Sequence, residues 1–423
     1  MHYHPLLRAF PCSFAIVLCS YSLQAEEPKA LRTVTVAECL RRVTEQSLDL
    51  KSGIYKTEAA QWRARQAARP INPRLETEIE NVAGSGDVER FDAAETTVTV
   101  SQEIELGGKR RHRTAVAESE TAASRAEQEM RLGTLLFETR RAALAAQSAQ
   151  EKVRLAEEAL ALIRETESVA AAREQAGKTT VLETERARAE TAKAEIEVEA
   201  RKAEQRDAVR ELALFWGETE PTFDAVDGPF DAADGTLPPL DDLLVRASSN
   251  PDLLAAEAQT RTYEARIGAE RAARVPNLEL IAGVRRFEEG GDFGFVAGVG
   301  IELPFHTRNL DGVRAAEADA EAARLAATAA RLRNEGVVRQ LYARLDTLRA
   351  RTARLKGTVL PATERTLALV RDAHRQGKAG YLDVIEARRT RVEARLHLIE
   401  TVTEYQGVSL ELGRLANTLS DNL

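Results

Sequence analysis

The chain has 423 residues, of which 30% are charged and only 5% are aromatic. This composition is typical of long helices packed through small side chains rather than of a thick globular core. The formal net charge of −8 gives no basic footprint of the kind that nucleic acid requires, so we expect no nucleic-acid partner.

Residues 1–25 have the features of a signal peptide. A basic residue, Arg8, precedes an apolar stretch, and Ala25 offers a small residue at the cleavage site. The alternative is an N-terminal helix that stays on the protein. A lipoprotein signal is less favoured, because Leu18 stands where a small residue would precede Cys19.

After residue 25 the sequence excludes two features. Cys39 is the only thiol left, so no intrachain disulfide is expected. No later segment reaches the roughly 18 consecutive apolar residues of a membrane-spanning helix. Any contact with a membrane would therefore be made by strands.

The sequence contains an internal duplication, which predicts two structural repeats. Four short motifs recur in the same order at nearly the same separation: Pro73–Glu76 with Pro276–Glu279, Ile104–Leu106 with Ile301–Leu303, Gly177–Lys178 with Gly377–Lys378, and Glu211–Leu212 with Glu411–Leu412. We predict a first repeat over 26–217, a proline- and glycine-rich linker over 218–239, and a second repeat over 240–419. Each repeat is expected to run helix, β-hairpin, very long helix, helix.

The very long helix is the most distinctive element of each repeat. Residues 108–176 contain no proline, which predicts a helix on the order of 100 Å long. Its counterpart over 306–376 contains Gly357 and Pro361, so we expect a kink there.

The hairpins, at about 74–106 and 277–303, alternate apolar and polar residues over strands of the length found in outer-membrane barrels. A half-buried hairpin in a soluble protein is the alternative. Two such hairpins flanked by polar helices favour a membrane. Four strands cannot close a barrel and an open edge cannot sit in lipid, so several copies must combine. Three copies would supply about 12 strands.

The first hairpin leads directly into its long helix through two glycines and a basic run. Gly107 and Gly108 are expected to absorb the change of direction, where the second repeat has Pro304. Lys109 and Arg110, with Arg111 and Arg113, would then lie at the inner-leaflet surface, where basic side chains meet lipid phosphates. The alternative is a solvated helix start.

The sequence resembles the TolC-type outer-membrane efflux proteins. The resemblance rests on the duplicated order of helices and hairpins, on the segment VSQEIELGGKR and on the corresponding segment VGIELPFHTRN in the second repeat. The motif IELGGKR is most similar to that of the CzcC-like heavy-metal efflux branch. The resemblance implies a homotrimer with a 12-stranded barrel in the outer membrane of a Gram-negative bacterium, contacting outer-membrane lipid. A long α-helical barrel would extend from it into the periplasm. It also implies two partners, a periplasmic adaptor and an inner-membrane resistance-nodulation-division pump.

Two patterns imitate ligand sites. Residues 172–179 match a loose phosphate-loop pattern, but a helix precedes them instead of a strand, so we interpret Gly177 as a helix C-cap. In the family such turns engage the adaptor, so four residues are candidates for docking: Gly177, Lys178, Gly377 and Lys378.

The histidines of the mature chain are scattered, so we expect them to be surface residues and expect no metal site and no cofactor: His112, His306, His374 and His397.

Asp383 and Glu386 are candidates for a periplasmic gate. They share one helix face and fall where the family carries paired aspartates that narrow the entrance. In a trimer they would form a ring of about six carboxylates, which attracts cations. Arg186 or Arg388 is a conceivable partner for the pair. The alternative is that both acids are solvated first-turn residues favoured by the helix dipole.

The resulting prediction is the channel component of a tripartite efflux system that passively conducts its substrate, heavy-metal cations in the favoured reading. A drug or protein export duct of the same family remains open, as does a periplasmic coiled-coil scaffold. An enzyme is not expected, because the sequence lacks a Ser-His-Asp arrangement and a cluster of metal ligands.

Overall fold

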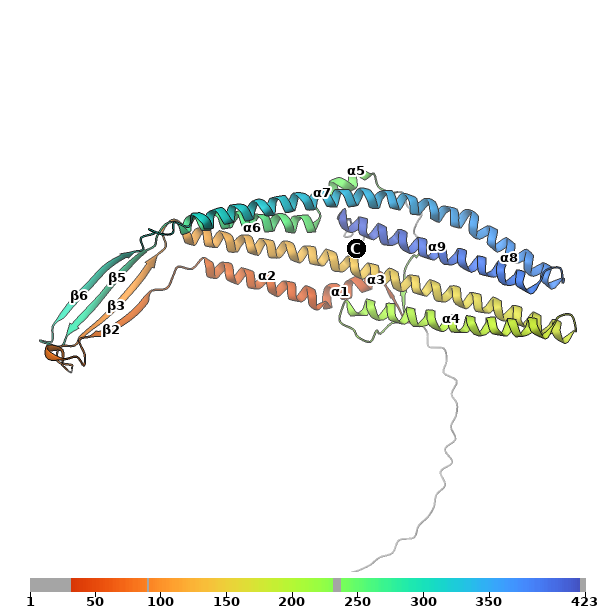
Figure 1. The fold of residues 1–423 in the computed structure, drawn as a ribbon, viewed down its shortest axis with the longest axis horizontal. Helices are drawn as coiled ribbons and strands as arrows, with labels where there is room; N and C mark the ends of the chain where they lie inside the picture. Colours follow the sequence, from red (N-terminus) through yellow and green to blue (C-terminus); the bar gives the residue numbers. More distant parts are fainter. Residues whose placement is uncertain (1–31, 90, 231–236, 419–423) are drawn as a thin grey trace, which may run out of the picture.

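The computed structural model describes residues 32–89, 91–230 and 237–418, so the predicted signal peptide lies outside the described residues. The molecule is a long, gently curved rod with a sheet at one end and paired helices at the other (Figure 1). The prediction of a mainly helical chain with a small β part is confirmed.

The two repeats share the order two helices, two long strands, very long helical segment, final helix, and the first is accompanied by two three-residue strands that have no counterpart in the described part of the second. The first contains β1 (Thr33–Thr35), α1 (Val36–Gln46), α2 (Leu48–Ala67), β2 (Arg74–Glu80), the 3₁₀ turn η1 (Gly86–Val88), β3 (Glu95–Ile104), α3 (Lys109–Gln175), α4 (Val181–Leu214) and β4 (Ala225–Asp227). The second contains α5 (Leu240–Ala247), α6 (Pro251–Ala273), β5 (Leu278–Phe287), β6 (Phe293–Ile301), α7 (Leu310–Arg354), the π-helical turn η2 (Leu355–Val359), α8 (Leu360–Arg375) and α9 (Tyr381–Leu415).

Helix α3 runs from the sheet to the far end of the rod (Figure 1). Its 67 residues correspond to a length of about 100 Å. It packs against α2 and α6 on the sheet side of the molecule and against α4 and α9 on the other side. The helices of the two repeats are therefore held together along a single continuous element.

Near Gly357 and Pro361, where we expected a kink, the structure has the π-helical turn η2 between α7 and α8. The amide of Leu360 donates to the carbonyl of Leu355, five residues back. Pro361 follows at the start of α8, so its missing N–H falls where the regular hydrogen-bond ladder is already interrupted.

Where we expected one helix before each hairpin, the structure has two, α1–α2 and α5–α6. The break between α5 and α6 is fixed by Asn250, which is 1% exposed. Its Oδ1 accepts from the amide of Asp252 at 2.7 Å, while its Nδ2 donates to the carbonyls of Arg414 and Leu415 at 3.0 Å each. One side chain thus caps α6 and binds the end of α9.

The four long strands form one antiparallel sheet in the order β2-β3-β5-β6. The register gives the sheet two unlike faces. On one face the cross-strand rows contain mainly apolar residues: Leu75–Val100–Ala282–Ala297, Thr77–Val98–Val284–Phe295 and Ile104–Leu278–Ile301. On the other face they contain polar residues and glycines: Glu76–Thr99–Gly283–Val296, Glu78–Thr97–Arg285–Gly294 and Glu103–Glu279–Gly300.

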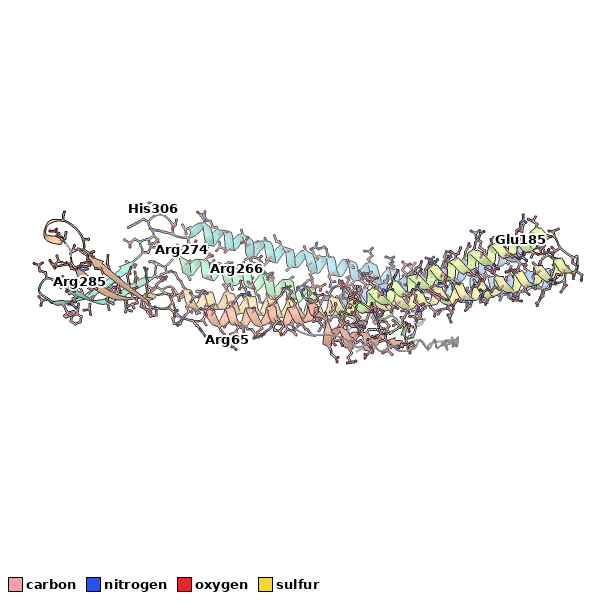
Figure 2. The ribbon with its side chains drawn as sticks, turned by 90° about the horizontal axis from the view of Figure 1, so that it is seen from below. Arg65, Glu185, Arg266, Arg274, Arg285 and His306 are labelled. Carbon is pink, nitrogen blue, oxygen red and sulfur yellow. The ribbon has the colours of Figure 1, made fainter. Side chains whose placement is uncertain are left out.

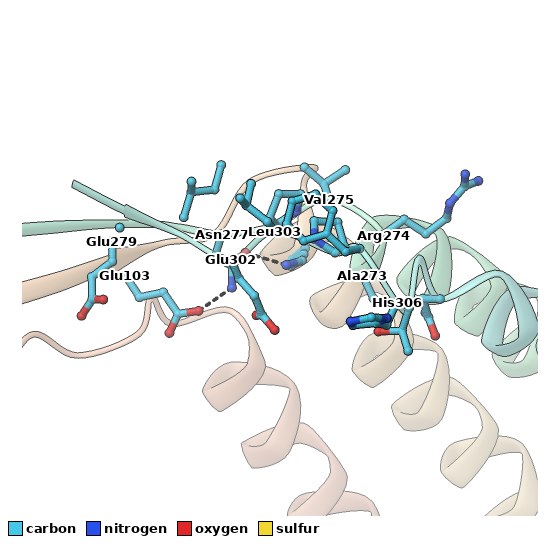
Figure 3. Close-up of a pocket in the computed structure, with 17 residues that line it drawn as sticks. Glu103, Ala273, Arg274, Val275, Asn277, Glu279, Glu302, Leu303 and His306 are labelled. Atoms are coloured by element: carbon cyan, nitrogen blue, oxygen red, sulfur yellow. Dashed lines mark hydrogen bonds between the residues drawn. The ribbon is translucent and has the colours of Figure 1, made fainter.

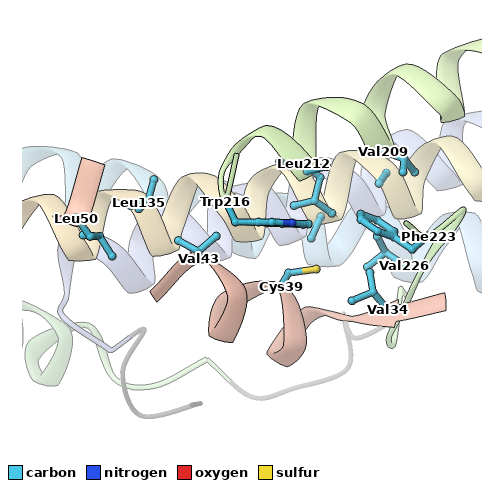
Figure 4. Close-up of a cluster of buried hydrophobic side chains, with 14 residues drawn as sticks. Val34, Cys39, Val43, Leu50, Leu135, Val209, Leu212, Trp216, Phe223 and Val226 are labelled. Atoms are coloured by element: carbon cyan, nitrogen blue, oxygen red, sulfur yellow. The ribbon is translucent and has the colours of Figure 1, made fainter. Parts of the chain in front are cut away.

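A hydrophobic core lies at the middle of the rod, where α1, α3 and the end of α4 meet (Figure 4). Trp216 packs against Phe223 with ring centroids 5.9 Å apart. Cys39 is fully buried in this core, and burial raises the pKa of its thiol to about 11.

The segment expected to be a linker, 218–239, is not wholly irregular. It contains β4, which pairs in parallel with β1 across the core. The sequence shows no period here because the strand has three residues and its partner belongs to the start of the described chain.

Candidate sites at the helix turns and the strand–helix junctions

The turns α3–α4 and α8–α9 lie together at the end of the rod opposite the sheet (Figure 1), and Figure 2 shows Glu185 at this end. Both turns have the same backbone. Gly177 and Gly377 have φ of 68° and 77°, in the left-handed region. The amides of Lys178 and Lys378 donate at 2.8 Å to the carbonyls of Arg173 and Ala373 respectively, closing the Schellman motif. This confirms a helix C-cap at Gly177 rather than a phosphate loop, and all four candidate docking residues are exposed: Gly177, Lys178, Gly377 and Lys378.

Asp383 and Glu386 lie in the first turn and a half of α9, and both are exposed. Asp383 Oδ2 accepts from the amide of Gly380 at 2.8 Å, so this carboxylate caps its own helix. Glu386 has no such local contact through its carboxylate among the hydrogen bonds of the described residues. Within one chain, the Asp383 carboxylate therefore stabilises the start of α9, and the Glu386 carboxylate does not.

Of the two arginines suggested as partners, Arg388 binds another acid. Arg388, which is 8% exposed, lies 3.5 Å from Glu190 of α4 rather than on Asp383 or Glu386. The conceived contact of Arg388 with the acidic pair is therefore wrong within the chain. Burial lowers the pKa of the Arg388 guanidinium, opposed by the nearby Glu190. Its Nη1 is buried without a hydrogen-bond partner.

The two turns touch through a small contact. Arg173 Nη1 donates to the carbonyl of His374 at 2.8 Å, which joins α3 to the end of α8. Tyr381 packs against Ala170 and Ala187 in a small apolar cluster. The pKa of Tyr381 is raised, first by burial and then by the neighbouring carboxylates, Glu190 foremost. The cluster and the hydrogen bond together hold the α3–α4 pair against the α8–α9 pair.

His374 lies at the centre of this contact and is 4% exposed, so the expectation that it is a surface residue is wrong. Its Nδ1 is 3.1 Å from the carbonyl oxygen of Ala379. Its Nε2 faces Glu183 Oε1 of α4 at 3.9 Å. Both of these facing atoms are buried and lack a hydrogen-bond partner.

At the junction of the first repeat, two consecutive residues have left-handed backbones. Gly107 and Gly108 have φ of 66° and 71°, and Gly108 is the N-cap of α3. A side chain at Gly107 would meet Val275 Cβ at 2.8 Å, so glycine also permits a close approach to the second repeat. Lys109 Nζ donates to Asn277 Oδ1 at 2.6 Å, while Arg110 is exposed.

One member of the basic run, Arg113, is bound to neighbouring groups although its side chain is 41% exposed. It donates to both carboxylate oxygens of Glu105, and to the backbone carbonyls of Ala67 and Arg69 at 3.0 Å each. The Glu105 side chain is only 9% exposed. Arg113 therefore ties the end of α2 to the strand–helix turn and does not lie free at a surface.

The second repeat makes its junction differently. Pro304 lies in an irregular connection, residues 302–309, and the left-handed residue is Asn309, the N-cap of α7, with φ of 50°. Asn309 Nδ2 donates to the carbonyl and to the carboxylate of Glu270. Asn309, not Pro304, is thus the counterpart of Gly108. A polar cavity of about 710 Å³ lies beside this connection and is lined by three carboxylates (Figure 3): Glu103, Glu279 and Glu302.

The apolar face of the sheet is uncovered in the single chain. Phe295 is 96% exposed, and Phe293, Leu75 and Val299 are each 70% exposed. A patch of this kind marks a surface that another apolar phase covers.

The opposite face carries an ion-pair network around Arg285, at the sheet end of the rod in Figure 2. Arg285 lies 2.8 Å from Glu95 and 3.2 Å from Glu80, and its Nε donates to Thr97 Oγ1 at 2.9 Å. Three strands are linked by this one side chain, on a face that otherwise has more carboxylates than cations.

Within the described ranges, His, Cys, Asp and Glu side chains form no group of three or more able to hold a metal ion. Of the remaining histidines, His306 and His397 are exposed and His112 is partly buried. No helix in the part of the chain that the structure describes has the length and hydropathy to cross a lipid bilayer.

Residues 39–218 and 246–418 match the profile of the outer membrane efflux protein family. These ranges span both repeats, from the first core helix to the end of α9. The chain belongs to this family. The family consists of channels rather than enzymes, so the predictions of an outer-membrane efflux channel and of no catalytic activity are confirmed.

Two relatives are cation-resistance proteins of Cupriavidus metallidurans. The chain is 27% identical to cobalt-zinc-cadmium resistance protein CzcC, over 92% of this chain and 91% of the relative. It is 29% identical to nickel and cobalt resistance protein CnrC, over 72% of each. The resemblance to the CzcC-like branch is thus confirmed. Among solved structures, that of CusC superposes with a TM-score of 0.77 at 18% identity, covering 91% of this chain and 92% of CusC.

The sequence did not reveal the structural roles of three residues: Arg113, Asn309 and His374. Arg113 was grouped with its basic neighbours, although the acid eight positions earlier, Glu105, was an available partner for it. Asn309 directly precedes the long helix, and asparagine tolerates a left-handed backbone. For His374 the signal was slight, since its partners come from other helices.

Proposed function

We propose that three copies of this chain form the outer-membrane exit channel of a tripartite efflux system and passively conduct divalent metal cations. The observation that carries the proposal is the two-faced sheet. A four-stranded sheet with an uncovered apolar face and two open edges fits a bilayer only as one part of a closed barrel. Three copies supply 12 strands, an even number within the range of such barrels.

The polar face of the sheet then lines the lumen. Per chain it carries two arginines, Arg74 and Arg285, and six carboxylates: Glu76, Glu78, Glu80, Glu95, Glu103 and Glu279. A lumen with this excess of negative charge attracts cations and repels anions. The cobalt, zinc, cadmium and nickel resistance named for the relatives supports the same choice of substrate.

The paired helices would continue the sheet as a second, helical barrel in the periplasm, with the turns at its tip. Asp383 and Glu386 would form the carboxylate ring there. The exposed turn residues would contact a periplasmic adaptor, and through it a resistance-nodulation-division pump: Gly177, Lys178, Gly377 and Lys378. Gly107, Gly108, Lys109, Arg110 and Pro304 would lie where the two barrels join. Lys109 is engaged by Asn277, which leaves Arg110 as the better candidate for lipid phosphate.

The deciding experiment measures assembly and conductance on protein purified from outer membranes. We expect the mass of a trimer in detergent and single channels in planar bilayers, with a reversal potential favouring cations in a salt gradient. Glu76→Gln with Glu78→Gln should reduce the cation preference, whereas Thr77→Val, on the opposite face, should leave it unchanged. A monomer without conductance would refute the channel, and equal permeation of anions would refute the cation-selective lumen.

The gate is tested by removing charge without removing the helix cap. Asp383→Asn with Glu386→Gln keeps an acceptor for the Gly380 amide and side chains of the same size, so we expect the loss of charge alone to lower the cation conductance. Lys178→Gln is the matched control, at an exposed tip position outside the ring. A double variant that conducts like the native protein would make both acids ordinary first-turn residues.

The cargo is tested by complementation of a strain that lacks the channel gene. Expression should restore growth in cobalt, zinc or cadmium salts more than growth in antibiotics or detergents. Restoration of drug tolerance alone would favour the drug-export alternative.

A further inference from the structure

The contact between the two helix turns contains two acceptor atoms that face each other without a hydrogen between them. His374 Nδ1 lies 3.1 Å from the carbonyl oxygen of Ala379. Because a carbonyl only accepts, Nδ1 carries the hydrogen of this bond. In the neutral ring Nε2 is then a bare lone pair, and it faces a carboxylate oxygen, Glu183 Oε1, at 3.9 Å.

Neither facing atom has another partner. His374 Nε2 and Glu183 Oε1 are both buried without a hydrogen bond, and the His374 side chain is 5% exposed. The other carboxylate oxygen, Oε2, already accepts from Thr179 Oγ1 at 2.5 Å. Two buried acceptors left in this state cost folding free energy, because each has lost its water.

A proton on Nε2 satisfies both atoms at once. A bridging water needs its two acceptors about 4.6 Å apart, given two bonds of ordinary length at a tetrahedral angle, and the observed 3.9 Å is too short. A metal ion would have only these two protein ligands, since no group of three or more ligand residues occurs among the described residues. A proton needs only a small closing movement.

Charged groups of both signs surround this contact. Glu183 faces the ring from α4. Tyr381 of α9 packs in the same contact, and the carboxylates that act on its hydroxyl are Glu190 and Glu183 of α4 and Glu167 of α3. The cations nearby are Arg173 of α3, which is bound to the His374 carbonyl, and Arg388 of α9, which is paired with Glu190. On α8 itself Asp372 is paired with Arg375, so Glu183 is the charged group that faces Nε2 directly.

We propose that His374 and Glu183 form a proton-binding site that fastens the α8–α9 turn to the α3–α4 turn. Histidine is the side chain whose ordinary pKa lies closest to neutral pH, so it is the member of this pair that gains and loses the proton. When Nε2 is protonated it donates to Glu183 and the two helix pairs are held together. As the pH rises the proton leaves, the carboxylate loses its donor, and the contact weakens.

The consequence for transport rests on the proposed function. If the turns form the periplasmic entrance, the entrance is held closed more firmly at acidic pH and opens more easily as the pH rises. The proton site itself does not depend on transport, so the two statements can be tested separately.

The site is tested by deuterium exchange at the imidazole carbon, which reports the titration of single histidines by mass spectrometry of the full-length protein in detergent. Glu183→Gln should lower the titration midpoint of His374 by about one pH unit, because it removes the opposite charge. The exposed His397 is the internal control and should not move. An unchanged His374 midpoint overturns the proposal. So does protection of His374 by added Zn²⁺ that disappears in Glu183→Gln, since a metal ion would then be the ligand.

The transport consequence is tested by conductance as a function of pH. Native channels should open several-fold more at pH 8 than at pH 5.5, His374→Gln should lose this dependence, and His397→Gln should keep it. The same dependence in His374→Gln overturns the inference. If the native protein forms no channels at any pH, the proposed function fails, and the deuterium-exchange result still decides whether the proton site exists.

Discussion

The two repeats make the same passage from strand to long helix with different chemistry. In the first repeat the connection is short, residues 105–108, and it depends on two left-handed glycines and on the bonds of Arg113 to Glu105. In the second it is longer, residues 302–309, and it turns on Asn309 and its bonds to Glu270. A short link needs a backbone that only glycine adopts freely, whereas a longer one can be held by a side chain. Duplication has preserved the path of the chain but not the residues that enforce it.

The largest effect should come from Gly107→Ala. The new side chain would be strained at φ of 66° and would press on Val275, which together cost about 3 kcal/mol. Gly108→Ala is the matched control, because its side chain would meet nothing closer than 3.7 Å and only the strain of about 1 kcal/mol applies. Apparent unfolding temperatures at one scan rate should fall in that order. Equal losses would mean that the packing against Val275 is unimportant.

Arg113→Ala should rank next. It removes the ion pair with Glu105 and two bonds to backbone carbonyls, and it leaves a carboxylate that is 9% exposed without its cation. The expected loss is about 2 kcal/mol, moderated because Arg113 itself is partly solvated. Arg110→Ala, at an exposed neighbour, should leave the stability unchanged. A comparable loss for both would indicate a general effect of charge at the helix start.

Asn309→Ala tests the second junction. It removes the bonds to Glu270 and the residue type best suited to a left-handed N-cap, for a loss of about 1 kcal/mol. Pro304→Ala should cost less, since the left-handed residue is elsewhere. The measurement is again the apparent unfolding temperature. If Pro304→Ala proved the more damaging, Pro304 would after all be the residue that sets the turn.

The smallest effect concerns the tips, where the repeats have identical backbones. Asp383→Ala removes the acceptor for the Gly380 amide and should speed local amide exchange of residues 380–386 about threefold, the equivalent of a lost cap. Exchange in the α3–α4 turn should not change. Faster exchange in both turns would show that the tips open together.

The sequence predicted the helices and caps that depend on neighbouring residues better than the features that depend on contacts between distant segments. The long helix α3 follows from an unbroken proline-free pattern, and the Gly177 cap from a glycine at the end of that pattern. The breaks before α2 and α6 are local too, but Asn250 makes its decisive bonds to the distant end of α9.

The candidate sites were predicted less completely for the same reason. Asp383 was placed in its first turn, and its contact with the Gly380 amide lies within that turn. The partner of Arg388 is on another helix and could not be read from spacing. The expectation that His374 is a surface residue was wrong because its contacts come from α3 and α4, which are distant from it in the sequence.

The π-helical turn of the second repeat also sets the rotational phase of the helix beyond it. In α7 the buried positions recur at alternating spacings of three and four: Val338, Leu341, Leu345, Leu348 and Thr352. Continued by sevens from Thr352, this stripe would reach Thr366 and Ala373, but the buried residues of α8 are Leu367 and His374. The turn has in effect inserted one residue, which rotates everything after it by about 100°. The imidazole at the tip therefore faces inward because of an extra residue nearly five helical turns away, and a deletion there would turn it outward without touching the tip.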